Sequence, residues 1–312
     1  MANFSGDRKY ETYNQLFCSE ETLTGISEEL TFFAVLNIPL SVTAFLGNIL
    51  IQVALHKESS LHPPTKLLLR SLSVSDLCVG LISEPITVIT WFSAVKEHSD
   101  FCRYALNSSV ITTFTLGTVS LLTLIAISVD RLLALLLGLR YRQVVTLKRT
   151  RMNVIAIWII SIIAPSVYFL NSHLTLWCGN IGILICLVIS TICYTKIFLN
   201  LRYHHTQVQD HVHHGQVSQA NQLNITRYRK AVYSALWLQL TLVACYLPQS
   251  IMGTLLINRE FSPSLFLALC FTSTLVYFNS SLNPILYCWK IREVRQAVKD
   301  TIRHLCCPSP SQ

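Results

Sequence analysis

Long apolar runs without charged residues alternate with short polar segments along this chain. Each of these runs is long enough for a helix of roughly 20 residues, which at about 1.5 Å per residue crosses the hydrocarbon layer of a bilayer. Runs without Lys, Arg, Asp or Glu lie at 30–55, 104–129, 152–195, 231–258 and 261–289, and a sixth, 71–95, is interrupted only by Asp76 and Glu84. The run at 152–195 is long enough for two helices, so the pattern predicts seven membrane spans.

We therefore expect an all-α membrane protein, a seven-transmembrane helix bundle followed by a short amphipathic helix on the membrane surface. After the seventh span, Ile291, Val294, Val298 and Ile302 recur at helical spacing with basic residues between them. That pattern is typical of a helix lying in the membrane interface. The predicted domains are an extracellular tail at 1–29, the seven-transmembrane domain at 30–288, the surface helix at 289–304 and a cytoplasmic tail at 305–312.

The charge distribution predicts the orientation of the bundle. Of the 312 residues, 52% are hydrophobic and only 13% are charged, against about 25% charged in soluble domains. With the N-terminus outside, nineteen of the 24 Lys and Arg fall on the inner side, as the positive-inside rule requires. The net charge of +8 then points to the anionic inner leaflet of the bilayer as its partner, and not to a nucleic acid. We expect a multi-pass plasma-membrane protein with an extracellular N-terminus.

Three acidic side chains in or beside these spans require partners. Asp76 lies close to the bilayer midplane, where a lone carboxylate costs about 2.5–3.5 kcal/mol. Glu84 lies two turns further out, either wetted by an outer vestibule or in contact with a ligand. Asp130 directly precedes Arg131 where the third span ends. This arginine either snorkels and marks a helix end, or is a switch that leaves Asp130 when the helices move.

The chain carries several candidate modification sites and no enzyme signature. Asn3 begins a glycosylation sequon in the outer tail, and Cys306 and Cys307 follow the surface helix where palmitoylation is common. Three cysteines, Cys18, Cys102 and Cys178, face the oxidising side, and an odd number leaves their pairing open. No nucleophile–base or metal-ligand spacing appears, so we expect neither an enzyme nor an organic cofactor.

Seven motifs, in order and each on its own span, resemble those of rhodopsin-like (class A) G-protein-coupled receptors. They are Gly47-Asn48, Leu72–Asp76, Asp130-Arg131, Trp158, Tyr194, Cys245 with Pro248, and Asn283-Pro284 with Tyr287. The resemblance implies a receptor that converts binding of an extracellular agonist into activation of a heterotrimeric G protein through outward movement of the sixth helix. The alternatives are an orphan receptor with constitutive or decoy activity, or a seven-helix transporter. The transporter is disfavoured because the two halves of the chain do not resemble each other.

The resemblance also implies roles for single residues. Arg131 would leave Asp130 to face the G protein, Tyr194 and Tyr287 would settle toward it, and Leu139 would insert into the G protein. Tyr246 would pivot above the kink at Pro248. At the base of the sixth span, Tyr228 stands where many members of this class have an acidic residue. The common lock on the arginine is therefore missing, which would raise basal activity.

Two further sites follow from the same resemblance. Asp76, Ser120, Asn279 and Asn283 match the inner sodium site of the class, where oxygen ligands suit a hard cation; the alternative is a network of water without an ion. A bridge between Cys102 and Cys178 is the usual outer disulfide, although Cys102 lies twenty-nine residues before Arg131, about four more than is usual.

The scaffold looks most like the melanocortin, adenosine, cannabinoid and lysolipid group, but no ligand follows from it. Pocket candidates are Glu84, Thr113, Tyr246 and Tyr277. Thr113 replaces the aspartate of amine receptors and Tyr277 replaces the retinal lysine of opsins. Leu106 and Val110 lack the acidic pair of melanocortin receptors. A short fourth-to-fifth connection leaves the pocket mouth open, which favours a small-molecule or lipid-like agonist.

Overall fold

The computed structural model describes residue 18 and residues 25–57, 61–95, 99–166, 172–213, 219–258, 262–290 and 292–306. Every regular element in these ranges is a helix. In chain order they are α3 (Ser27–Lys57), α4 (Pro63–Cys78), the π-helix η1 (Val79–Ser83), α5 (Glu84–Val95), α6 (Ser99–Leu137), the 3₁₀-helix η2 (Gly138–Arg140), α7 (Tyr141–Val144), α8 (Leu147–Ser166), α9 (Ser172–His213), α10 (Gln219–Asn258), α11 (Pro263–Lys290) and α12 (Arg292–Cys306).

Within the described residues, six helical segments are long and apolar enough to cross a membrane. They are Ser27–Lys57, Pro63–Val95, Asp100–Val144, Leu174–Asn200, Gln239–Asn258 and Pro263–Cys288. The predicted fourth span corresponds to α8, which is helical but is not among the six. Its first five residues include Lys148, Arg149 and Arg151, and its described part ends at Ser166, so a shorter apolar stretch is left. The coarse prediction, an all-α membrane bundle, is confirmed.

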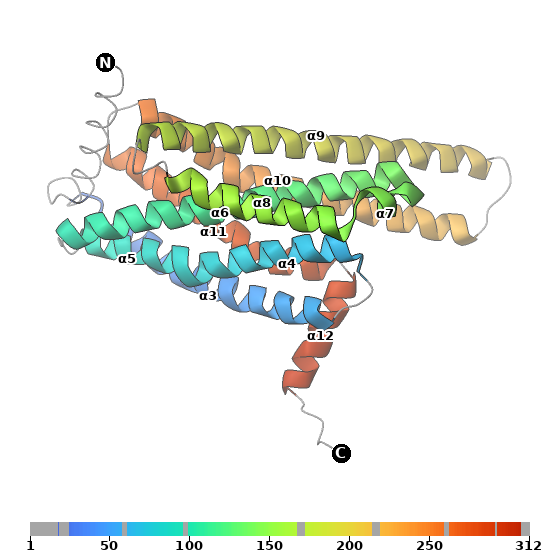
Figure 1. The fold of residues 1–312 in the computed structure, drawn as a ribbon, viewed down its shortest axis with the longest axis horizontal. Helices are drawn as coiled ribbons and strands as arrows, with labels where there is room; N and C mark the ends of the chain where they lie inside the picture. Colours follow the sequence, from blue (N-terminus) through green and yellow to red (C-terminus); the bar gives the residue numbers. More distant parts are fainter. Residues whose placement is uncertain are drawn as a thin grey trace.

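The long helices lie side by side along the length of the molecule (Figure 1). Helix α3 packs against α4, α5, α11 and α12, and α9 packs against α10. Helix α12 leaves the inner end of the bundle at a steep angle to the other helices (Figure 1). One apolar cluster, around Leu72 and Leu124, fills the inner part of the bundle, and a second, around Leu30 and Trp91, fills the outer end.

The second span contains a widened turn where it meets the first. Pro85 has no N–H to donate to the turn before it, and the preceding residues form the π-helix η1, in which the Glu84 N–H bonds to the Val79 carbonyl. Gly80 in this turn lies directly against α3. A Cβ on Gly80 would be 2.7 Å from the Ser41 carbonyl oxygen, and the Ser41 hydroxyl donates to the Gly80 carbonyl at 2.6 Å. Only glycine fits this approach.

The Gly47-Asn48 pair in α3 is explained by Pro284 in α11. A Cβ on Gly47 would lie 3.0 Å from Pro284 Cγ, so glycine lets the proline ring approach. Because Pro284 has no N–H, the carbonyl four residues earlier, that of Ser280, loses its intrahelical partner. The Asn48 Nδ2 donates to this carbonyl at 3.2 Å, and Asn48 is fully buried. One proline in α11 therefore accounts for both residues of the motif.

Candidate functional site

The carboxylate of Asp76 is the centre of a buried polar cluster between α4, α6 and α11. Its side chain is 0% exposed. Oδ1 accepts hydrogen bonds from Ser280 Oγ at 2.8 Å and Ser120 Oγ at 3.1 Å, and Oδ2 accepts one from Asn283 Nδ2 at 2.7 Å. Charge-assisted bonds of this kind are the stronger class of hydrogen bond. The cluster supplies the partners that an aspartate at mid-membrane depth requires.

Three of the four residues predicted to bind sodium meet in this cluster: Asp76, Ser120 and Asn283. Asn279 is buried nearby in sequence, but its Nδ2 has no partner among the described residues. Ser280 takes its place at the carboxylate, and sequence reasoning missed it although it directly follows Asn279. A cavity of about 10 Å³, room for one water-sized sphere, borders both Ser120 and Ser280.

A network of hydroxyl groups lies on the outer side of that cavity. Tyr277 Oη is 2.7 Å from Thr113 Oγ1 and 2.8 Å from Thr87 Oγ1. Thr113 also contacts Ser83 at 2.9 Å, and Thr87 contacts Ser109 at 2.7 Å. These five residues, which we call the hydroxyl network, tie η1 and α5 to α6 and α11. Two of the predicted pocket residues, Thr113 and Tyr277, thus bond directly to each other.

Glu84 lies next to the hydroxyl network in sequence but does not join it. Its side chain is 0% exposed, and neither carboxylate oxygen has a hydrogen-bond partner in the described part of the chain. The interpretation of Glu84 as a carboxylate wetted by an outer vestibule is wrong for this conformation. The fourth pocket candidate, Tyr246, is also buried and lines the small cavity together with Thr113 and Tyr277.

The charged pair at the inner end of α6 is present, but the aspartate has closer partners than the arginine. Arg131 Nε is 3.9 Å from Asp130 Oδ2, and the arginine side chain is 47% exposed against 3% for the aspartate. Tyr141 Oη donates to Asp130 Oδ1 at 2.6 Å and Thr65 Oγ1 donates to Oδ2 at 2.9 Å. Sequence reasoning gave no role to Tyr141 or Thr65, which come from α7 and α4.

The other predicted switch residues occupy two kinds of environment. Tyr194 and Tyr287 are buried in the inner half of the bundle, and the Tyr287 hydroxyl has no partner among the described residues. Leu139 is 98% exposed, immediately after Gly138, whose φ of 49° favours glycine. Arg131 and Leu139 therefore present a cationic and an apolar side chain at the same end of α6.

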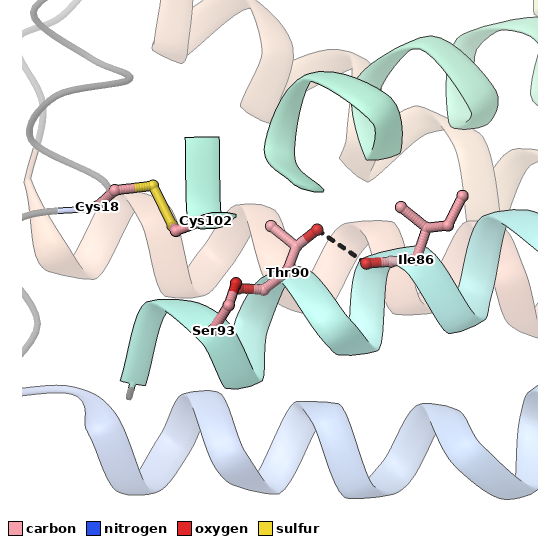
Figure 2. Close-up of a disulfide and its surroundings, with 5 residues drawn as sticks. All are labelled: Cys18, Ile86, Thr90, Ser93 and Cys102. Atoms are coloured by element: carbon pink, nitrogen blue, oxygen red, sulfur yellow. Dashed lines mark hydrogen bonds between the residues drawn. A yellow bond between two sulfur atoms is a disulfide. The ribbon is translucent and has the colours of Figure 1, made fainter. Parts of the chain in front are cut away.

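The predicted outer disulfide is wrong in one partner. Cys102 bonds to Cys18 of the N-terminal tail (Figure 2), and Cys178 is a free, exposed thiol in α9. Cys102 is 1% exposed within the apolar cluster at the outer end of α3, α5 and α11, where Cys18 also packs. The roughly four additional residues before Arg131 carry Cys102 about one turn further outward, into reach of the tail. Asn3 and Cys307 lie outside the described residues, and so does the side chain of Cys306.

Comparison with known proteins agrees with this geometry. Residues 47–176 match the family model of the 7 transmembrane receptors of the rhodopsin family. This match and the relatives described next support a class A, rhodopsin-like G-protein-coupled receptor, a class of signalling receptors and not of enzymes.

Within that class, the chain is related to the melanocortin receptors. It is 24% identical over 308 residues to melanocortin receptor 4 of Danio rerio, covering 91% of this chain and 86% of that receptor. It is 25% identical to melanocortin receptor 5 of Rattus norvegicus over 284 residues, 86% of this chain and 82% of the relative. It is also 25% identical to melanocortin receptor 5 of Mus musculus over 296 residues, which cover 90% of this chain and 86% of that receptor.

Proposed function

We propose that this receptor converts binding of an extracellular agonist into activation of a heterotrimeric G protein by outward movement of the inner half of α10. The observation that carries the proposal is the inner end of α6. Asp130 is buried and held by two hydroxyl groups, while the Arg131 side chain is 47% exposed and Leu139, in the turn that follows α6, is 98% exposed. A cation and a leucine presented together at the cytoplasmic end suit a partner that brings hydrogen-bond acceptors and an apolar pocket.

We propose that α8 also crosses the membrane, as the fourth span in chain order, which brings the number of spans to seven. We place the chain in the plasma membrane with the N-terminus extracellular. Trp158 Nε1 donates to Ser71 Oγ of α4 at 3.2 Å, which fixes one face of α8 against the bundle. Its other face exposes Ile155, Ile159 and Ile163. In water such a face would be costly, whereas lipid solvates it.

Helix α12 is proposed to lie on the inner leaflet. Its residues Val294, Ala297 and Val298 are buried against the bundle, while Arg295 and Lys299 are exposed. Basic side chains beside an apolar face attract anionic lipids. Palmitoylation of Cys306 and Cys307 would add lipid anchors at its end.

A sodium ion is proposed at Asp76. The donor set fits a hard cation because it offers carboxylate, hydroxyl and amide oxygens next to a small cavity. Asp76, Ser120 and Asn283 would hold the ion, with Ser280 in addition to the predicted set. When bound, it would offset the buried negative charge of Asp76.

The agonist is proposed to be a small or lipid-like molecule that contacts the outer polar residues Glu84, Thr113, Tyr246 and Tyr277. The hydroxyl network supports this because each of its groups can exchange an internal bond for one to a ligand. Constitutive activity is a second candidate, favoured by Tyr228 at the base of the sixth span and by the exposure of Arg131. Both candidates use the same G-protein face.

The test is a G-protein dissociation assay across G-protein subtypes, with and without a broad agonist library. The wild-type receptor should activate at least one subtype. The Arg131→Ala variant should abolish that activation, because it removes the exposed guanidinium. Its surface expression should be retained. Full signalling by Arg131→Ala at equal surface expression would refute the proposed role.

A further inference from the structure

Gln239 begins the apolar stretch of α10 and joins this helix to α9. Ser190 Oγ of α9 donates to Gln239 Oε1 of α10 at 2.6 Å, and Gln239 Nε2 donates to Thr191 Oγ1 at 2.8 Å. Both ends of the Gln239 amide are therefore bonded to α9, and Ser190 is 1% exposed. We call these three residues the inner clamp. In lipid there is little water to replace either bond if the helices separate.

A second polar contact joins the same two helices nearer the outer side. Asn180 Oδ1 of α9 accepts a hydrogen bond from Ser250 Oγ at 2.8 Å, and Asn180 Nδ2 donates to Thr254 Oγ1 at 2.5 Å. Pro248 lies between Gln239 and Ser250 in α10. The two contacts thus hold α10 to α9 on either side of the position where its hydrogen-bond ladder is interrupted.

A swing of α10 about Pro248 would displace the two contacts by different amounts, because they lie at different distances from the proline. Ser250 is two residues beyond the proline, roughly 3 Å along the helix, whereas Gln239 is nine residues before it, roughly 13 Å along the helix. A swing of the inner half of α10 about Pro248 would leave Ser250 nearly in place and would move Gln239 away from α9. The inner clamp is therefore the contact that such a swing must break.

Among the side chains that the structure describes, no ion pair joins α6 to α10. Position 228, at the base of the sixth span, is a tyrosine and not an acidic residue that would hold an arginine. Arg131 forms its ion pair with the adjacent Asp130, on its own helix. Neither feature ties α6 to α10 by charge, so the resting position of α10 depends on its contacts with neighbouring helices.

We propose that Gln239 is the positioning residue that holds α10 in the resting conformation through Ser190 and Thr191, and that activation breaks this clamp. The inference deepens the proposed function, because it names the contact that opposes the movement of α10. It assigns the low-activity state to a lateral contact with α9 and not to a contact with α6.

The experiment compares basal G-protein activation per receptor at the surface. Gln239→Leu and Ser190→Val remove the bonds and should each raise basal activity about fivefold, in keeping with one or two interhelical hydrogen bonds in a membrane. Basal activity of the double variant should be close to that of each single variant, because the two substitutions remove the same contact. Ser190→Thr adds the same bulk as valine but keeps the hydroxyl, so it should stay near wild type.

Gln249→Leu is the matched control on the same helix. Its Oε1 accepts a hydrogen bond from Thr272 of α11 at 2.7 Å, and it lies beyond Pro248, so its loss should not raise basal activity. The inference is overturned if Gln239→Leu and Ser190→Val leave basal activity unchanged, or if Gln249→Leu or Ser190→Thr raises it equally.

A fluorescence sensor separates this inference from the proposed function. A donor inserted within residues 214–218 and an acceptor after residue 312 report movement of the inner end of α10 without any G protein. A shifted sensor signal in Gln239→Leu with no response from any G-protein subtype would support the clamp and refute the proposed coupling. An unshifted signal in Gln239→Leu and Ser190→Val would refute the clamp whatever the G-protein result.

Discussion

The hydroxyl of Tyr141 lies 2.6 Å from Oδ1 of Asp130, whereas Nε of the adjacent Arg131 lies 3.9 Å from Oδ2 of the same carboxylate. Because Tyr141 begins the short helix α7, this bond ties the inner loop to the end of α6. Thr65 of α4 holds the other carboxylate oxygen. Asp130 is thus held by two hydroxyl groups from other helices, while the Arg131 side chain is half-exposed.

Removing the Tyr141 hydroxyl should raise basal activity. Tyr141→Phe deletes a charge-assisted hydrogen bond, a class of interaction that contributes about 1.5–3 kcal/mol, and so weakens the hold on the resting Asp130. We expect a several-fold rise in ligand-independent G-protein activation at equal surface expression. Tyr104→Phe, at an exposed position, is the control. Unchanged activity in Tyr141→Phe would mean that the bond does not restrain the switch.

Sodium should stabilise the receptor through Asp76. In thermal unfolding of the purified receptor, replacing choline chloride with sodium chloride at equal ionic strength should raise the unfolding temperature, by the equivalent of about 1.4 kcal/mol for an ion at ten times its dissociation constant. Asp76→Asn should abolish the difference, and Ser280→Ala should reduce it. If wild type shows no difference between the two salts, the cluster is a hydrogen-bond network with water and holds no ion.

Stability should depend on Cys18 and Cys102, which form the outer disulfide, and not on Cys178. Cys18→Ser and Cys102→Ser should each lower the free energy of unfolding by about 2–4 kcal/mol, because the bridge closes a loop between residues 84 apart. Cys178→Ser should leave stability unchanged, since Cys178 is a free, exposed thiol. Peptide mapping under non-reducing conditions should recover the Cys18–Cys102 pair; recovery of a Cys102–Cys178 pair would contradict it.

Gly80 should not tolerate a side chain. Gly80→Ala places a Cβ 2.7 Å from the Ser41 carbonyl oxygen and 2.8 Å from the Phe45 nitrogen, both backbone atoms, so α3 and the second span must separate. We expect a loss of about 1–3 kcal/mol in stability and reduced surface expression. Gly117→Ala, where nothing lies within 4 Å of the added Cβ, is the matched control. Equal thermal stability of the two variants would refute the close packing of these helices.

The sequence by itself determined the helical membrane bundle, because hydrophobic runs and the distribution of charge are local and one-dimensional. It also determined which polar residues need partners. An asparagine or aspartate within an apolar run cannot be left without hydrogen bonds in a low-dielectric interior, so Asn48, Asp76 and Asn283 were identifiable as members of polar clusters. The fourth span was less clear, because three basic residues precede its apolar stretch.

Only the tertiary structure decided which groups satisfy those residues. Asn48 bonds to the Ser280 carbonyl that Pro284 leaves free, Ser280 and not Asn279 reaches Asp76, and Cys102 pairs with Cys18. Likewise Tyr141 and not Arg131 makes the shortest contact to Asp130. Each of these choices depends on the rotation and depth of one helix relative to another. The packing of the whole bundle sets that rotation and depth, and the hydrophobic periodicity of a single helix does not predict them.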